Sequence, residues 1–217
     1  MLFIDGEAIV IDKPAGLPVD APRAGGDSVT ARLDELKLGF QRPPVPMHRL
    51  DRDTSGCLLL ARNPKARARF AQAFENGAVE KVYVAVVDGE LTGEGLVNMP
   101  LDKTSSAERG WRMVADERGK PARTRWRALS SEAGRTLIEF RPETGRTHQI
   151  RAHARYGLDA AIVGDPIYGT GREAMLLHAL RLVVPRERKA AIDVTAPLPQ
   201  RFGEWAHFDK LRTGNAL

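Results

Sequence analysis

The chain has 217 residues, 42% of them hydrophobic, which suits one domain with a sizeable core. No stretch approaches the roughly 18 apolar residues of a membrane helix, and the N-terminus lacks the basic region and apolar block of a signal peptide. The single cysteine, Cys57, excludes an internal disulfide and precedes a run of leucines. We therefore expect a buried thiol in a cytoplasmic protein.

The formal net charge of +5 is unevenly distributed along the chain. Residues 101–155 hold 13 Lys and Arg against 7 Asp and Glu, whereas the remainder holds 20 basic and 21 acidic residues. A positive field concentrated in one half is expected where a polyanion lies across one face. A solvated, arginine-rich surface would give the same pattern, so charge alone leaves nucleic-acid binding open.

The first elements are expected to be a strand, a turn and a short helix. Residues 8–12 are mostly apolar and predict a strand, which a turn rich in proline and glycine then ends. Lys13 opens this turn and is expected to be exposed. A helix is expected at residues 29–36, because Asp27 or Ser28 can cap it and its apolar residues recur on one face.

A polar stretch at residues 47–56 leads into an apolar run, residues 57–61, which is expected to be a buried strand. Asp51 lies between Arg49 and Arg52, which favours an ionised carboxylate that can act as nucleophile or base. A loop held on a core strand suits such a group. Spacing alone favours the alternative, a surface turn with charge pairs.

A helix and a central strand are expected after the polar stretch. Asn63 and Pro64 form a helix start, and Gly77 lies where the helix should stop. Residues 79–87 are rich in β-branched side chains and predict a strand. From the pattern alone, Tyr83 in this strand is a core residue whose hydroxyl finds a partner.

Residues 88–120 are glycine-rich and predict hairpins and a variable loop. Within them Trp111 lies between two arginines, a weak sign of base or phosphate binding. Strands are expected at residues 120–129 and 136–140, paired antiparallel. Alternation along the first of these places three cations on one face, which is either solvated or an RNA surface: Arg123, Arg125 and Arg127.

A second polar stretch, residues 142–153, is expected to start a helix, with Thr147 as the cap. This helix would carry Arg151 on its first turns. His148 and His153 could be taken for metal ligands. They are five residues apart rather than four, and no acid completes a set, so we reject a metal site.

Several stretches are similar to motifs of the RluA-type pseudouridine synthases, among them residues 48–56, 81–83, 120–129, 142–153 and 161–169. The most specific is His48-Arg49-Leu50-Asp51 followed by Thr54-Ser55-Gly56. In the last stretch, alanine precedes where the family usually has proline, and we expect this to change the turn rather than the chemistry. The resemblance extends over about residues 7–202, nearly the whole chain.

The resemblance implies an α+β fold: a mixed, mainly antiparallel, bifurcated sheet flanked by helices, with a central active-site cleft. Periodicity independently indicates α+β. One catalytic domain is expected over residues 1–206, followed by a tail at residues 207–217, without an extra N-terminal RNA-binding module. Residues 176–182 match a strand of the family, and His178 within it is expected to be a packed structural histidine.

The reaction implied by the resemblance is isomerisation of uridine to pseudouridine in structured RNA, ribosomal or transfer, with no cofactor and no metal. Asp51 would supply the catalytic carboxylate, either attacking the base or assisting at the ribose. Tyr83 would accept the proton from C5, and Arg151 would orient Asp51. Arg49 is a candidate to fill the space left by a flipped base, and Arg146 to bind phosphate or support its loop. The remaining candidate substrate contacts are His148 and Gln149.

Two other functions compete with this one. A non-catalytic RNA-binding assembly factor is disfavoured by the intact set of Asp51, Tyr83 and Arg151. A hydrolase using Asp51 and Asp53 as an acid–base pair would cleave a bond with water, whereas a synthase gives a product of unchanged mass; only two residues separate these acids. The protein is expected to be a monomer.

Overall fold

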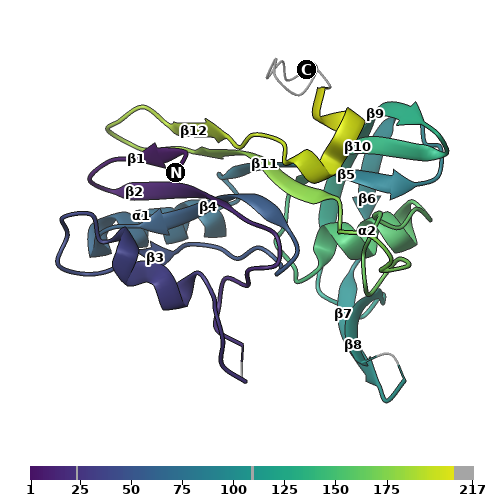
Figure 1. The fold of residues 1–217 in the computed structure, drawn as a ribbon, viewed down its shortest axis with the longest axis horizontal. Coiled ribbons are helices and arrows are strands. Elements are labelled where there is room, and N and C mark those ends of the chain that lie inside the picture. The colour runs from purple at the N-terminus through teal and green to yellow at the C-terminus, as the bar shows by residue number, and fades with distance from the viewer. Residues whose placement is uncertain (23, 109, 208–217) are drawn as a thin grey trace. The chain divides into compact units, whose positions relative to one another are not determined.

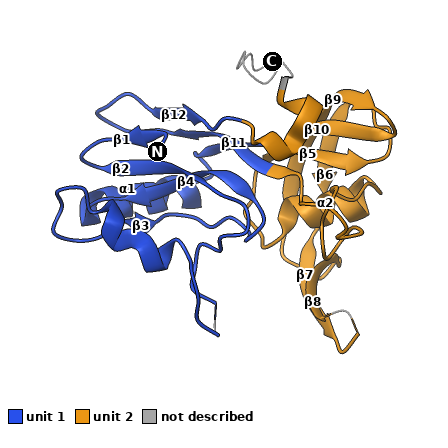
Figure 2. Ribbon diagram, viewed as in Figure 1, with its two compact units in different colours: residues 1–83, 178–197 blue, residues 84–177, 198–217 orange. Residues whose placement is uncertain are grey.

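The computed structural model describes residues 1–22, 24–108 and 110–207 (Figure 1). The chain divides into two compact units (Figure 2): unit 1 comprises residues 1–83 and 178–197, and unit 2 comprises residues 84–177 and 198–217. The range expected to form one domain therefore includes parts of both units. Of the helices in the described ranges, none combines the length and hydropathy that a bilayer-spanning segment requires.

Unit 1 contains a mixed sheet built from β1 (Phe3–Ile4), β2 (Ala8–Lys13), β3 (Val45–Pro46), β4 (Ser55–Ala61), β11 (Leu177–Val184) and β12 (Ile192–Thr195). The order is β1, β2, β4, β11, with β3 paired to β4 and β12 paired to β11. The β4–β11 pair is parallel, and the other pairs are antiparallel. The strands expected from the first apolar runs and near residues 176–182 are confirmed.

The close pairing of β4 with β11 explains the residues at the start of β4. Gly56 has φ +108°, and a Cβ added there would lie 2.2 Å from the carbonyl oxygen of Ala179, so only glycine fits. Cys57 follows with 1% of its surface exposed. Burial raises the pKa of its thiol to about 12. The expected role as a packing thiol is confirmed.

Helix α1 (Pro64–Glu75) begins as its sequence predicts. The Asn63 side chain accepts a hydrogen bond from the backbone N–H of Ala66 at 2.9 Å, and Pro64 occupies the first turn. Gly77 has φ +67° just after the helix, a conformation that favours glycine. Ala66 and Phe70 are buried and attach the helix to the unit 1 core.

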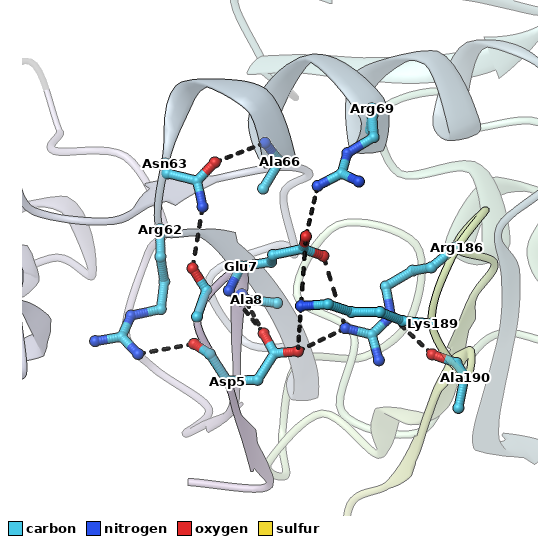
Figure 3. Close-up of polar contacts among 11 residues, drawn as sticks. Asp5, Glu7, Ala8, Arg62, Asn63, Ala66, Arg69, Arg186, Lys189 and Ala190 are labelled. Carbon is cyan, nitrogen blue, oxygen red and sulfur yellow. Dashed lines mark hydrogen bonds and ion pairs between the residues drawn. The ribbon is translucent and has the colours of Figure 1, made fainter.

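An ion-pair network ties the turn between β1 and β2 to more distant segments of unit 1 (Figure 3). Arg186 contacts Asp5 at 2.6 Å, and Lys189 lies 3.4 Å from Glu7. Arg69 reaches Glu7 from α1 at 2.7 Å. Exposed pairs contribute little individually, but this network includes partly buried carboxylates and joins three segments far apart in sequence.

Unit 2 contains the strands β5 (Glu80–Asp88), β10 (Arg135–Pro142), β9 (Arg123–Glu132) and β6 (Glu94–Asn98), in that order, and β9 pairs antiparallel with both β10 and β6. The division between the units falls within β5. The hairpin of β7 (Leu101–Ser106) and β8 (Gly110–Ala115) forms a separate two-stranded sheet. The α+β class with a mixed, mainly antiparallel sheet is confirmed, as are the hairpin and the pairing of β9 with β10.

Helix α2 (Gln149–Gly157) packs on one face of this sheet. His153, fully buried, contacts the Thr124 hydroxyl through Nδ1 at 2.8 Å and the Met99 carbonyl through Nε2 at 3.0 Å. Because Nε2 faces a carbonyl, it must carry the proton, and Nδ1 accepts from Thr124. Burial lowers the pKa of His153, which keeps this neutral form at neutral pH.

Two helix predictions are wrong in detail. Residues 30–36 form a 3-10 helix, η1 (Thr30–Leu36), in which Ser28 accepts a hydrogen bond from the Ala31 backbone. Thr147 does not cap α2: the residue before the helix is His148, which has φ +52° and makes no side-chain cap. Helix η2 (Gln200–His207) ends the described chain, and the predicted tail lies outside the described residues apart from His207.

Candidate active site

The loop that carries Asp51 ends in a tight turn directly before β4. The Thr54 backbone N–H donates to the Asp51 carbonyl at 3.1 Å, and Thr54 and Ser55 are buried. The Ser55 hydroxyl lies 2.7 Å from Nδ1 of His178, a buried contact that joins β4 to β11. The Asp51 side chain is half-buried. The loop therefore forms the expected turn and also carries the half-buried carboxylate of Asp51. His178 has the structural role expected of it.

Lys13 corrects the prediction of an exposed turn lysine. Its side chain is fully buried, and Nζ donates to the carbonyls of Pro14 at 2.8 Å, Leu17 at 2.7 Å and Arg52 at 3.1 Å. The Arg52 carbonyl also accepts from the backbone of Gly16 at 2.9 Å. Because a buried ammonium needs several acceptors, the lysine draws the first turn and the Asp51 loop together.

Replacing Lys13 by methionine keeps most of the side-chain volume but removes the Nζ donor from three carbonyls, of which only that of Arg52 keeps another donor, the Gly16 backbone N–H. We expect the free energy of unfolding to fall by about 2–3 kcal/mol, since orphaned buried polar groups cost about 1–3 kcal/mol each. Urea denaturation measures this loss. Lys65→Met on the exposed face of α1 is the control, and equal stability of the two variants would contradict the role given to Lys13.

Tyr83 lies on β5 at the edge of the unit 1 core and packs against the buried cluster that includes Leu50 and Leu58. Burial raises the pKa of its phenol, and the negative charge of Asp51 raises it further. This electrostatic coupling brings together two of the three predicted catalytic residues within unit 1. The phenol is therefore protonated at neutral pH.

His48, which precedes Asp51 in the central motif, supports the scaffold. Its Nε2 accepts a hydrogen bond from the Leu59 backbone at 3.0 Å, and its ring lies 5.3 Å from that of Phe74. Burial, with a smaller contribution from Lys81, lowers its pKa to about 4. A neutral imidazole that accepts from β4 fixes the entry of the loop.

Arg151, the third predicted catalytic residue, forms a buried pair with Asp165 in unit 2. Nε and Nη2 contact the two carboxylate oxygens at 2.7 and 2.8 Å. The side chain of Arg151 is 5% exposed and that of Asp165 is fully buried. This fork-to-fork pair fixes the plane of the guanidinium.

Asp165 is the residue that sequence reasoning missed. It also accepts from the backbone N–H groups of Ile167 at 2.8 Å and Tyr168 at 3.0 Å. Burial raises the pKa of its carboxyl, but Arg151 and these two N–H groups outweigh burial and hold the pKa below its usual range. The signal was available, because a buried arginine requires a carboxylate nearby.

Gln149 differs from the expected substrate contact. Its side chain is 4% exposed, and its carbonyl accepts from the Thr144 hydroxyl at 2.7 Å and the Arg146 backbone at 2.9 Å. Its amide nitrogen donates to the Arg123 carbonyl and the Thr124 hydroxyl, both at 2.9 Å. With both ends used inside the protein, Gln149 orders the loop before α2.

His148 joins the β7–β8 hairpin to the start of α2. Its ring stacks on Trp111 with centroids 4.8 Å apart, and its Nδ1 lies 3.2 Å from the Tyr168 hydroxyl. That hydroxyl also accepts from the Met113 backbone at 2.9 Å. The guanidinium of Arg151 lies 5.3 Å from the Tyr168 ring centre, so this aromatic group borders the Arg151–Asp165 pair.

The two remaining predicted contacts are exposed arginines. Arg49 lies 3.9 Å from Asp20, with 69% of its side chain exposed. Arg146 donates through Nε to the Pro121 carbonyl at 3.0 Å, in keeping with loop support. Both side chains retain solvent-facing surface.

Comparison with known proteins gives consistent results. The family model described as RNA pseudouridylate synthase matches residues 7–156. The chain is 52% identical over 207 residues to an uncharacterized RNA pseudouridine synthase of Zymomonas mobilis, covering 93% of this chain and 94% of the relative. It is 36% identical over 198 residues to ribosomal large subunit pseudouridine synthase D of the same organism, covering 88% of this chain and 61% of that relative.

Among solved structures, human RNA pseudouridylate synthase domain containing 4 matches with a TM-score of 0.77 and 26% identity. The match covers 97% of this chain and 92% of the human chain. The fold and the sequence motifs therefore lead to the same group of proteins.

Proposed function

The chain belongs to the RNA pseudouridylate synthase family, and from this premise we propose that Asp51, Tyr83 and Arg151 together convert uridine to pseudouridine in structured RNA. The family expected from the sequence is confirmed. The observation that carries the proposal is geometric: Leu50, the neighbour of Asp51, belongs to the buried cluster against which Tyr83 packs. In keeping with this, the charge of Asp51 helps raise the pKa of the Tyr83 phenol. A carboxylate and a phenol can supply the nucleophile or base and the proton-transfer group that this isomerisation requires.

The reaction is an internal rearrangement in which all atoms are conserved. The bond from uracil N1 to ribose C1′ breaks, the base turns, and a bond forms from C5 to C1′. The C5 proton leaves and N1 gains one, so no oxidant, reductant or energy source is required, and we propose that no cofactor or metal takes part. Asp51 either attacks the base or assists at the ribose.

Tyr83 is proposed to manage the proton at C5. Its phenol is protonated at neutral pH, so it can accept the C5 proton only as its own proton leaves. The product requires a proton at N1, which gives that proton a destination. The partly apolar surroundings of Tyr83 also suit a stacked base.

Arg151 is proposed to orient the carboxylate of Asp51. Asp165 holds Nε and Nη2, so the guanidinium plane is set before any substrate arrives. A pre-set arginine loses little conformational entropy when it holds a second carboxylate. Asp165 is then a positioning residue for the site.

The substrate is proposed to be ribosomal RNA of the large subunit, or transfer RNA, bound by a monomer in the cytoplasm. The name of the Zymomonas mobilis synthase D relative supports the ribosomal choice. The test compares the pseudouridine positions in RNA from a strain that lacks this gene with those in RNA from the parent strain. Carbodiimide treatment followed by primer extension detects these positions. One uridine that loses its pseudouridine signal identifies the target, whereas identical profiles would contradict the proposal.

Tyr83→Phe removes only the hydroxyl. We expect the rate of pseudouridine formation to fall by about 10²–10³-fold, within the usual range for loss of a proton-transfer group. RNA affinity should change less than threefold, because the aromatic ring remains. Single-turnover assays on the mapped RNA measure the rate, and activity within threefold of wild type would rule out proton transfer by Tyr83.

A further inference from the structure

A hollow of about 580 Å³ lies on the face of unit 2 that is turned away from α2. Thr124, which bonds to α2, and Arg125, which lines the hollow, are successive residues of β9 and therefore point to opposite faces. The volume falls within the range of small-molecule sites, roughly 300–1,000 Å³. Strands β6, β9 and β10, within the orange unit of Figure 2, supply its side chains: Glu94, Leu96, Arg125, Arg127, Glu139 and Arg141.

Two arginines face each other across the middle of the hollow. Arg125 is directly opposite Arg141 in the register of β9 and β10. Directly opposed side chains have Cβ atoms about 4.5–5.5 Å apart, and like charges there are destabilising. The Nε of Arg125 donates to Glu143 at 2.7 Å and that of Arg141 to Glu139 at 2.9 Å. Over the described ranges, no terminal nitrogen of either guanidinium has a hydrogen-bond acceptor.

Arg127 adds a third donor beside this pair. Its Nε is buried and has no hydrogen-bond partner in the described part of the chain, while Nη2 lies 3.6 Å from Glu139. Three arginines against two glutamates leave the lining with one net positive charge. A single phosphodiester would neutralise it and accept from the opposed guanidinium groups, the geometry in which arginine binds phosphate best.

An apolar side chain completes the wall. Leu96 lies opposite Arg125 on the β6 side and is 39% exposed. A ribose or base attached to a bound phosphate would cover it. We propose that this hollow binds a phosphodiester and its adjoining nucleoside in the RNA substrate, as a contact separate from the catalytic residues.

The inference rests on the proposed function, since it takes RNA as the substrate. The competing account is a solvated lattice of ion pairs that binds nothing. That account leaves the terminal nitrogens of the opposed Arg125 and Arg141 without an acceptor in the described ranges, although their Nε atoms are paired with carboxylates. The two accounts differ in what happens to RNA affinity when the opposed arginines are removed.

The test variant is Arg125→Gln/Arg141→Gln. Each glutamate keeps an arginine, because Glu143 still pairs with Arg123 and Glu139 with Arg127. We therefore expect the fold to persist, with a melting temperature no lower than wild type. The matched control is Arg135→Gln/Arg155→Gln. It removes the same charge from exposed ion pairs elsewhere in unit 2.

Steady-state kinetics on the RNA mapped above and salt titration with a 5′-labelled 20-nucleotide RNA give the readouts. We expect the test variant to raise KM about tenfold relative to the control, with kcat unchanged, for the loss of charge-assisted hydrogen bonds. The slope of log K against log salt should fall by about 0.7 for one lost phosphate contact on a single strand. A KM and a slope equal to those of the control would overturn the inference.

A titration with inorganic phosphate shows whether the hollow prefers RNA or binds any small anion. Nε–Hε signals of Arg125 and Arg141 are followed by NMR at constant ionic strength. RNA should shift both signals in wild type, and sodium phosphate should shift them far less. Shifts by phosphate alone, with an unchanged KM in the test variant, would overturn the RNA assignment. Failure of wild type to form pseudouridine would instead refute the proposed function.

Discussion

Asp51→Asn is expected to reduce pseudouridine formation by about 10⁴-fold, the upper range for loss of a catalytic side chain that moves or stabilises charge. The amide keeps the shape of the carboxylate but cannot act as an anionic nucleophile or base. Since the loop is held through the backbone by Thr54 and by Lys13 at Arg52, it should keep its conformation. RNA affinity should therefore change less than threefold. Single-turnover conversion and filter binding give the two values.

The matched control is Asp53→Asn, in the same turn. Asp53 is half-buried like Asp51, but it has no role in the proposed chemistry. We expect its activity within threefold of wild type. Equal loss in both variants would indicate an acid–base pair, and an RNA fragment in place of a product of unchanged mass would identify a hydrolase.

Asp165→Ala is expected to lower the free energy of unfolding by about 3–5 kcal/mol, because it leaves the Arg151 guanidinium buried without its carboxylate. It also orphans the N–H groups of Ile167 and Tyr168. Pseudouridine formation should fall as well, since Arg151 loses its fixed plane. Urea denaturation and conversion assays on the same preparation measure both effects.

The difference in free energy of unfolding between wild type and Asp165→Ala should depend on pH with a defined sign. The pKa of Asp165 is lower in the folded protein than its ordinary value. Its stabilising contribution is therefore complete above the unfolded pKa of about 3.9 and is lost as pH falls through the folded value. Asp165→Ala should thus differ most from wild type at pH 6–7 and progressively less below pH about 4. A difference that grows towards acid pH would contradict the pair as described.

A second variant separates stability from positioning. Arg151→Met/Asp165→Leu replaces the buried pair with apolar side chains of similar volume, which often restores or improves stability. We expect it to unfold close to wild type while remaining inactive. An active double variant would show that Arg151 does not orient Asp51.

Local elements were predictable where the side chain that decides them is adjacent in sequence. Asn63 and Pro64 predict the start of α1, and the apolar runs predict β4 and β5. The coupling of Tyr83 to Asp51 followed from family motifs rather than from spacing, because 31 residues lie between them. Sequence patterns indicate which residues are candidates for reactivity, and only the structure shows which of them lie close together.

The features that escaped prediction depend on partners that patterns do not reveal. Lys13 was expected to be exposed because no acidic side chain in the sequence marks a partner for it. Its acceptors are backbone carbonyls, one of them on Arg52, and every residue has a carbonyl, so the sequence does not show which ones it meets. Asp165 lies 14 residues after Arg151, beyond helical or strand spacing. The left-handed conformation of His148 moved the start of α2 away from Thr147. In each case tertiary contacts overrode a local preference.

The most direct test of the account is tritium release from RNA labelled at C5 of uridine, taken from a strain that lacks this gene. Purified wild-type protein should release tritium in proportion to the pseudouridine formed, with RNA mass otherwise unchanged, and Asp51→Asn should release none. Absence of release by the wild type, with tight RNA binding retained, would contradict catalysis and identify a binding factor instead.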